Sequence, residues 1–534
     1  MSIKRGTCSG TLGGGLPRTS SYTRSPQAEG SETHDRTTSI ETVRSWKLPP
    51  DPARSEHWSH RLPPGRGLGA TGTRGPMSMH HTAGHRLDAV PIGKFHRRFI
   101  LLVCLGIFWD SFDNTLSASV LASLLPTGFS TLALNSVFIS VTFAGLAIGA
   151  ALAGWVSDRF GRAFAFQVSL GFFGVLALCA SLAPSMEVLI AIRGLMAIGM
   201  GAEYVICYGM VIEFIPRIRR GRYLGIIGIA GGIGVSLSSI VGALVIPVWT
   251  WRAMFVIAGV GALTAWWLRR RMPESPRWLE SRGRYEEAEA ILRKIESESG
   301  STPVTPEQQV SGVAGEQAEW VPIKVLFTRP IIRRTLMALI LTISCLFGSY
   351  AITGWMPTFF VAQGMSVTKS LGYSAAILSG YVVGPLLCVF LADRLGRPRS
   401  VVLFGVLAAI FAGIYPFMTD PVAVISVGFV LVAMAAAFLT MALGSVPEFF
   451  PTAFRFRGGG FTQTVGRTFL IISPFIILYL FTNFGIVGVI LVVSGVYLAV
   501  SLLNLVVRVD TSAETLAHLA DEAEHVPVEI RSEA

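Results

Sequence analysis

Two short stretches decide the fold: Asp-Arg-Phe-Gly-Arg at residues 158–162 and Asp-Arg-Leu-Gly-Arg at residues 393–397. The second begins 235 residues after the first, since 393 minus 158 is 235. A different motif has the same offset, with Glu-Phe-Ile-Pro at residues 213–216 and Glu-Phe-Phe-Pro at residues 448–451. Two separate motifs at one fixed offset indicate an internal duplication. We therefore expect two homologous halves in parallel repeat, with any central site at their interface.

The composition excludes most classes of soluble protein. Of the 534 residues, 51% are hydrophobic and only 14% are charged, whereas a soluble globular chain is about one-quarter charged. A helix needs about 20 apolar residues to cross the hydrocarbon of a bilayer. We predict an all-α membrane protein with twelve transmembrane helices in two six-helix halves. The predicted spans are 99–125, 135–157, 163–183, 187–213, 223–247, 251–268, 335–361, 371–393, 400–418, 421–446, 461–481 and 484–507.

This pattern divides the chain into five segments. Residues 1–90 form a polar tail without apolar runs, which we expect to be disordered. The tail is either a genuine cytoplasmic extension or partly a mis-called start, with Met77 or Met79 as the true first residue. The other segments are the first half (91–268), a polar cytoplasmic loop (269–334), the second half (335–507) and a C-terminal tail (508–534).

Arginine is distributed unevenly between the two sets of short loops. If the N-terminus is inside the cell, the short inner loops carry eleven arginines, whereas the short outer loops carry only Arg252 and Lys369. Positive residues are retained on the cytoplasmic side of membrane proteins. We therefore predict a multi-pass protein of the inner cell membrane with both termini in the cytoplasm.

The repeated motifs place charges at the inner ends of helices. Such charges can pair across the inner face in one conformation and separate in another, so we assign them to gating. The alternative is that they are ordinary helix-end charges that complement loop arginines. The gating set is Asp158, Arg159, Gly161, Arg162, Glu213 and Arg222 in the first half, and Asp393, Arg394, Gly396, Arg397, Glu448 and Arg455 in the second.

Residues 154–162, Gly-Trp-Val-Ser-Asp-Arg-Phe-Gly-Arg, resemble the signature loop of the major facilitator superfamily. Residues 273–279, Pro-Glu-Ser-Pro-Arg-Trp-Leu, resemble the sugar-porter signature that follows the sixth helix. The resemblance covers about residues 88–510 and implies a twelve-helix transporter that works by alternating access. The chain departs from sugar porters in the seventh helix, where they carry a Gln-Gln-x-Ser-Gly type motif and residues 341–350 contain no Gln. We therefore do not expect hexose recognition.

Apart from residues at the ends of the predicted spans, five charged residues lie inside them, and none has a charged counterpart at the 235-residue offset. They are Asp110, Asp113, Arg193, Glu203 and Arg467. Charges at such depth are costly unless they are paired or hydrated, so each is a candidate for function. Asp110 and Asp113 are three positions apart and share one face of a helix, where each carboxylate raises the proton affinity of the other.

We assign four of these residues to proton coupling. Asp113 occupies the place of the first-helix Asp in proton-coupled sugar porters, and Arg193 matches their fourth-helix Arg. The resemblance implies that Asp113 accepts a proton, which releases Arg193 and permits the conformational change. The alternative is a permanent salt bridge between two helices. Asp110 joins this set, and Glu203 is either a further proton site or a contact for a cationic substrate.

Arg467 is the candidate for substrate binding. With the neighbouring Gly466 and the downstream Pro474, it resembles a pattern in aromatic-acid and metabolite proton symporters. A fixed guanidinium suits a carboxylate, and the alternative is that Arg467 pairs with Asp110 or Glu203. We expect further substrate contacts, through stacking and hydrogen bonds, from Tyr350, Trp355 and Gln463.

The sequence thus predicts proton-coupled symport of a small organic acid, with an aromatic acid as one candidate. The alternatives are a sugar, polyol or organic-cation transporter, a drug exporter, and, in a different class, a transceptor or channel-like protein. We expect a monomer whose partners are a small-molecule substrate, protons and the lipid bilayer. Enzymatic activity, a cofactor, a metal site and nucleic-acid binding are not expected.

Overall fold

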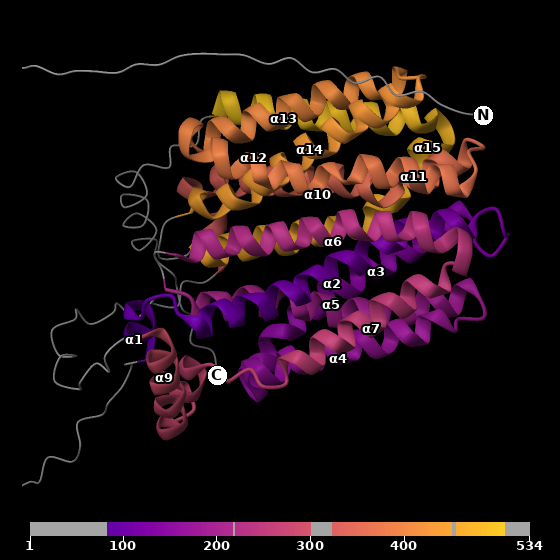
Figure 1. The fold of residues 1–534 in the computed structure, drawn as a ribbon. Coiled ribbons are helices and arrows are strands. Elements are labelled where there is room, and N and C mark those ends of the chain that lie inside the picture. Colours follow the sequence, from indigo (N-terminus) through magenta and orange to yellow (C-terminus); the bar gives the residue numbers. More distant parts are fainter. Residues whose placement is uncertain (1–82, 217–218, 301–322, 451–454, 508–534) are drawn as a thin grey trace, which may run out of the picture. The chain divides into compact units, whose positions relative to one another are not determined.

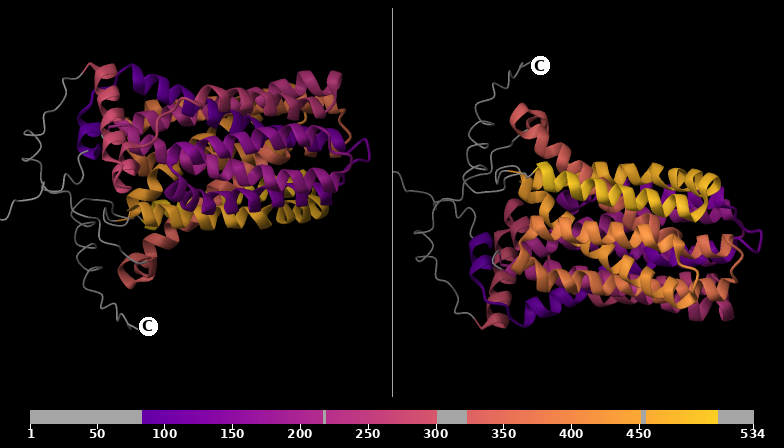
Figure 2. Two further views of the ribbon diagram at one scale, coloured as in Figure 1. Left: turned by 90° about the horizontal axis from the view of Figure 1, so that it is seen from below. Right: turned by 90° about the horizontal axis from the view of Figure 1, so that it is seen from above.

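The computed structural model describes residues 83–216, 219–300, 323–450 and 455–507, and each regular element in these ranges is a helix (Figure 1). The elements are α1 (Ala83–Ala89), α2 (Lys94–Leu124), α3 (Leu132–Phe160), α4 (Arg162–Ser181), α5 (Met186–Phe214), α6 (Arg220–Trp249), α7 (Arg252–Arg269), α8 (Pro276–Ser281), α9 (Tyr285–Ser299), η3 (Ile323–Phe327), α10 (Arg329–Ala362), α11 (Val367–Leu378), α12 (Gly380–Leu395), α13 (Arg397–Ile414), η4 (Tyr415–Phe417), α14 (Pro421–Ser445), η5 (Val446–Phe449) and α15 (Arg455–Val507). We call the end of the bundle that carries α1, α8 and α9 the basic end (Figures 1 and 2).

The predicted number of spans is confirmed in the described part of the chain. Ten helices are long and apolar enough to cross a membrane. One of these, α15, contains two spans, because its helical geometry is interrupted at Gly485 (φ 65°, ψ −167°). A further span is α7, whose 18 residues begin and end with arginine. The short elements α11 and α12 together make a single span, Val367–Leu391. These helices provide the twelve predicted spans, with ends that differ from the predicted ones by a few residues.

The packing of the helices repeats between the halves. In the first half (α2–α7), the main pairs are α2 with α6, α3 with α5, and α4 with α7. Their counterparts in the second half are α10 with α15, α12 with α14, and α13 with α15. The halves meet where α3 contacts α15, α6 contacts α11 and α2 contacts α10. Two hydrogen bonds cross this interface, from Ser140 Oγ to the Ile471 carbonyl (2.7 Å) and from Ser236 Oγ to the Leu378 carbonyl (3.1 Å).

The duplicated loop has the same backbone shape in both halves. Gly161 has φ 106° and ψ 156°, and Gly396 has φ 76° and ψ 151°. These positive φ angles favour glycine, because a Cβ atom would meet the neighbouring backbone. The next residue in each half, Arg162 or Arg397, begins a helix. The glycines of the two motifs are therefore required by the sharp turn between consecutive spans.

Side-chain caps begin helices at the end of the bundle opposite the basic end. Thr131 precedes α3, and its Oγ1 accepts a hydrogen bond from the Leu134 N–H at 3.2 Å. Asp420 precedes α14, and its Oδ2 accepts from the N–H groups of Val422 and Ala423, both at 3.0 Å. Such caps satisfy N–H groups that have no partner within the helix.

Residues 83–90 correct our expectation that the whole of 1–90 is disordered, because they include the helix α1. Ala83, Leu87 and Val90 recur at helical spacing and are buried in one apolar cluster with Leu292 and Ile295 of α9. This pattern spans barely two turns, which is too short to stand out from a polar tail. The central segment 269–334 likewise contains helices and not only loop. The predicted tails 1–82 and 508–534 lie outside the described residues.

Charged contacts fix α1 to α9. Arg86 donates to Glu296 (Nε to Oε1, 2.8 Å) and to Glu289, and Arg86 and Glu296 are both buried. Burial by itself would raise the pKa of Glu289, but hydrogen bonds from Arg86 and Arg293 outweigh it and bring that pKa below its ordinary value. Glu289 is therefore charged at neutral pH.

We predict that a chain beginning at Met77 inserts and unfolds like the full-length chain, because it keeps all of α1. A chain beginning at Pro91 should lose about 3–5 kcal/mol of stability, since Glu296 then loses the guanidinium that compensates its buried charge. Thermal unfolding in detergent measures both, with Arg293→Ala, which removes an exposed partner of Glu289, as the control. Equal stability of the Met77 and Pro91 chains would contradict a structural role for α1.

Candidate functional site

Asp113 and Arg193 form a fully buried ion pair between α2 and α5, as predicted. Arg193 Nη1 donates to Asp113 Oδ2, and both side chains have 0% exposure. Arg193 Nε also donates to Thr142 Oγ1 of α3 at 3.2 Å, and its Cζ lies 5.5 Å from the ring centroid of Phe138. The guanidinium therefore joins three helices of the first half at one point.

The same ion pair is incompletely satisfied. Asp113 Oδ1 and Arg193 Nη2 are buried, and neither has a hydrogen-bond partner among the residues that the structure describes. The desolvation of a buried pair is repaid only when its remaining donors and acceptors are also bonded. Opening the pair therefore breaks fewer hydrogen bonds than opening a fully bonded one.

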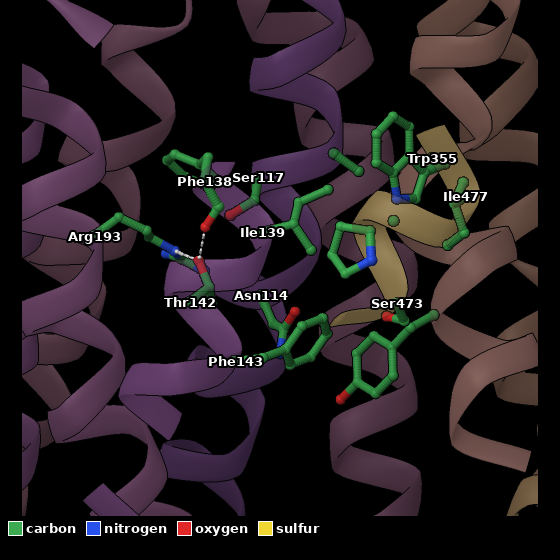
Figure 3. A pocket seen from close by; sticks show the side chains of 14 residues that line it. Asn114, Ser117, Phe138, Ile139, Thr142, Phe143, Arg193, Trp355, Ser473 and Ile477 are labelled. Atoms are coloured by element: carbon green, nitrogen blue, oxygen red, sulfur yellow. Dashed lines mark hydrogen bonds between the residues drawn. The ribbon is translucent and has the colours of Figure 1, made fainter. Parts of the chain in front are cut away.

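A small cavity lies beside Arg193 at the interface of the two halves (Figure 3). In Figure 3, Arg193 reaches Thr142 on one side of the cavity, whereas Trp355, Ser473 and Ile477 of the second half lie on the other. Helices α2, α3, α5, α10 and α15 supply its walls. The lining residues are Asn114, Ser117, Ala118, Phe138, Ile139, Thr142, Phe143, Arg193, Tyr350, Gly354, Trp355, Ser473, Pro474 and Ile477.

Two of the predicted substrate contacts, Tyr350 and Trp355, line this cavity. Tyr350 meets Phe143 of the first half edge to face, with ring centroids 4.9 Å apart. Trp355 is buried and stacks on Phe359 with centroids 5.8 Å apart. Aromatic rings from both halves therefore form part of the cavity wall, and a buried cation lies at one side.

Asp110 lies one turn before Asp113 on α2 and is 8% exposed. Its Oδ1 is buried and receives no hydrogen bond from the described residues. A buried carboxyl oxygen without a protein donor is suited to carry a proton.

Glu203 pairs with Arg269, a residue that the sequence analysis missed. Arg269 Nη1 donates to Glu203 Oε1, and Ser169 Oγ donates to Glu203 Oε2 at 2.7 Å. Arg269 Nε donates to the Leu102 carbonyl at 2.9 Å, and its Cζ lies 3.9 Å from the ring centroid of Phe166. We call Glu203, Arg269 and Ser169 the brace, because they tie α7, α5, α4 and α2 together. The sequence places Arg269 in the predicted polar loop, as the first of three consecutive arginines, whereas in the structure it is the last residue of α7.

Gly106 of α2 leaves the space that the brace needs. A Cβ atom at this position would lie 1.6 Å from Arg269 Nη2 and 2.5 Å from Glu203 Oε1. Both atoms belong to buried side chains, so neither can move into water.

We predict that Gly106→Ala separates Arg269 from Glu203 and lowers stability by about 3–5 kcal/mol, the cost of breaking a buried pair. Gly228→Ala is the matched control, because the added Cβ meets nothing within 4 Å. Thermal unfolding compares the two variants. Unchanged unfolding of Gly106→Ala would refute the structural role of the brace.

Arg467 lies against Tyr204, and the contact crosses from the second half to the first. Its Cζ is 4.4 Å from the Tyr204 ring centroid, and Tyr204 in turn packs on Tyr208 with centroids 4.8 Å apart. Arg467 is half-buried. Within the part of the chain that the structure describes, it forms no ion pair with Asp110 or Glu203. Gln463 lies one turn before Arg467 on α15 and is also half-buried.

Three of the first-half gating residues meet at the basic end. Arg162 Nη1 donates to Asp158 Oδ1 at 2.6 Å, and Arg162 Nε donates to Glu213 Oε1 at 3.0 Å. Trp278 of α8 donates from its indole N–H to the Asp158 carbonyl at 2.9 Å. Glu274 accepts from the Arg162 N–H at 2.8 Å, at the beginning of α4. These contacts join the basic-end termini of α3, α4 and α5 to one another and to the segment that contains Glu274 and α8.

The other gating residues lie apart from this cluster or outside the described side chains. Arg159 lies over the rings of Trp155 and Phe160, with Cζ 5.8 and 5.7 Å from their centroids, and Arg222 is exposed. Glu448 lies on η5 and is half-buried. The side chains of Asp393, Arg394, Arg397 and Arg455 lie outside the described part of the structure.

We predict that Asp158→Asn slows the transport cycle at least tenfold with little change in substrate affinity or stability. The Asp158 side chain is 69% exposed, and exposed ion pairs contribute less than about 1 kcal/mol to stability. Turnover in proteoliposomes and equilibrium binding separate the two effects. Lost affinity with normal turnover would contradict a gating role.

The repeated halves, the cavity between them and the buried ionisable groups beside it together define a membrane transporter. The chain matches the family described as "Sugar (and other) transporter" over residues 106–522. It belongs to that family, within the major facilitator superfamily, and is therefore a multi-pass transporter of metabolites and not an enzyme.

Similar proteins agree with this assignment. The inner membrane metabolite transport protein YdjE of Escherichia coli (strain K12) is 32% identical over 454 residues, which cover 83% of this chain and 100% of that protein. The niacin transporter NiaP of Acinetobacter baylyi is 30% identical over 434 residues, covering 81% of this chain and 98% of that protein. Among solved structures, the proton:xylose symporter XylE bound to 6-bromo-6-deoxy-D-glucose has a TM-score of 0.61 at 20% identity, covering 80% and 98% of the two chains. The similarity to this solved structure supports the assignment of the fold.

Proposed function

We propose that the protein is a proton-coupled symporter of a small organic carboxylate, with aromatic acids as the leading candidates. The observation that carries the proposal is Arg467. Its Cζ lies over the Tyr204 ring, 4.4 Å from the centroid, and a guanidinium offers paired N–H donors to a planar carboxylate. The relative NiaP is a niacin transporter, and niacin is a pyridine carboxylic acid. This relationship supports a substrate of the same chemical class.

We infer that Asp113 is the proton acceptor and Arg193 its switchable partner. Protonation neutralises the Asp113 carboxylate and removes its attraction for Arg193 Nη1. Arg193 keeps its hydrogen bond to Thr142 and can turn toward the cavity that it already lines. Because the cavity lies between the halves, this change alters the interface that must open and close in alternating access.

Asp110 is our second proton acceptor, and Glu203 is assigned to the brace instead. Glu203 is held in the brace by Arg269 and Ser169. In contrast, the buried Asp110 Oδ1 has no hydrogen-bond donor among the described residues and so loses none when a proton binds.

The gating cluster completes the proposed cycle. We place the basic end on the cytoplasmic side of the inner membrane, because most loop arginines gather there. Asp158, Arg162 and Glu213 then hold the inner ends of first-half helices together. When the halves rearrange, these charges exchange partners, which sets the rate of the cycle.

A sugar or polyol carrier is the second candidate function. The cavity offers hydroxyl and amide groups from Asn114, Ser117, Ser473 and Tyr350, which suit a neutral polyhydroxylated ligand. A substrate of this class would not need Arg467, so the two candidates differ in their response to its substitution.

We predict that Arg467→Gln weakens nicotinate binding by about 2–5 kcal/mol, the range for a desolvated charge pair that loses one partner. Arg467→Lys should also be impaired, since an ammonium group lacks the planar two-donor edge. Isothermal titration of the purified protein measures both variants, with nicotinamide and xylose as neutral comparators. Binding of a neutral ligand that is equally tight in the wild type and in Arg467→Gln would favour the sugar alternative.

We predict that Asp113→Asn abolishes uphill accumulation of substrate driven by a proton gradient but retains exchange of substrate across the membrane. The amide keeps the shape of the carboxylate and cannot take up the proton. Uptake and counterflow in proteoliposomes measure the two activities, and Glu187→Gln, an exposed acid on α5, is the control. Accumulation that persists in Asp113→Asn would exclude it as the coupling acid.

A further inference from the structure

We propose that Tyr204 is a positioning residue, which holds Arg467 in the orientation that binds the substrate carboxylate. The inference rests on the proposed function in that a carboxylate is the ligand of Arg467. Its structural basis is the contact between Arg467 Cζ and the Tyr204 ring, at 4.4 Å from the centroid.

The geometry of this contact uses the guanidinium without consuming its donors. An aromatic ring attracts a cation through its electron-rich face. The five N–H groups of arginine lie in the guanidinium plane and point outward from its edge. The Tyr204 ring therefore holds the guanidinium by attraction to the cation, while its own hydroxyl bonds to Tyr208, so the Arg467 N–H groups remain available to a ligand.

The Tyr204 ring is itself held from two sides. Tyr208 packs against it with centroids 4.8 Å apart and an interplanar angle of 39°, and the two hydroxyl groups are 3.4 Å apart. The preceding residue, Glu203, is locked to Arg269 and Ser169 in the brace. The brace thereby fixes the turn of α5 from which Tyr204 projects.

Positioning is needed because Arg467 has a long side chain on the opposite half of the protein. Among the described residues, no ion pair orients Arg467: Glu203 is bonded to Arg269, and Asp110 forms no salt bridge with Arg467. Loss of the Tyr204 ring would leave the guanidinium free to adopt several rotamers, and the substrate would then pay the entropy of ordering it.

The first test is a double-mutant cycle on nicotinate affinity, measured by isothermal titration. Tyr204→Leu should weaken nicotinate binding about tenfold and leave nicotinamide binding unchanged, whereas Tyr204→Phe should remain within about threefold of the wild type because it keeps the ring face. In an Arg467→Gln background, Tyr204→Leu should have no further effect. An equal loss in both backgrounds would overturn the proposal, since Tyr204 would then act independently of Arg467.

A second test needs no substrate. Phenylglyoxal modifies accessible arginines, and mass spectrometry follows the rate at Arg467. We expect a several-fold faster reaction in Tyr204→Leu than in the wild type or Tyr204→Phe, and Tyr479→Leu, an exposed tyrosine of α15, is the control. An unchanged rate would overturn the positioning role. If the wild type binds no carboxylate but the modification rates differ as expected, the proposed substrate class fails while the role of Tyr204 toward Arg467 stands.

Discussion

A charge inside a bilayer must be compensated, and the arrangement of this bundle follows from how each buried charge meets that requirement. Arg269 meets it completely, with Glu203, a backbone carbonyl and an aromatic ring around one guanidinium. Arg193 meets it in part, because one of its donors and one oxygen of Asp113 have no partner among the described residues. The contrast separates the brace from the pair that we propose protonation opens, within the same half of the molecule.

The duplication supplies the scaffold, and the charged residues that occur in only one of the two halves supply the proposed chemistry. The glycine turns at Gly161 and Gly396 and the matching helix pairs recur in both halves. The acids Asp110 and Asp113 and the cation Arg193 occur in the first half alone, whereas Arg467 belongs to the second. A substrate at the interface would meet proton-binding groups from one side and a carboxylate-binding group from the other. This asymmetry provides a physical reason for substrate and proton to move together.

The sequence predicted the spans, the repeat and the meeting of Asp113 with Arg193, because each of these depends on composition, spacing or a specific family resemblance. It did not predict Arg269, whose neighbours Arg270 and Arg271 made it look like part of a basic loop. Only the fold shows that α7 continues to this residue and that Gly106 leaves room for it. Tyr204 was missed for a related reason: a tyrosine in an apolar helix carries no signal until its cation, 263 positions later (467 minus 204), is placed against it. The substrate remains the least predictable feature, since aromatic and small polar cavity walls suit several ligands.

The central claim is that the Asp113–Arg193 pair opens by taking up a proton when substrate binds. The most direct measurement is proton uptake by the purified protein in a weakly buffered solution, followed with a pH indicator as nicotinate is added. The account predicts that the wild type removes protons from solution in proportion to bound nicotinate and that this uptake is greatly reduced in Asp113→Asn, which still binds the ligand. Equal proton uptake by the two proteins would contradict it, because another group would then carry the proton.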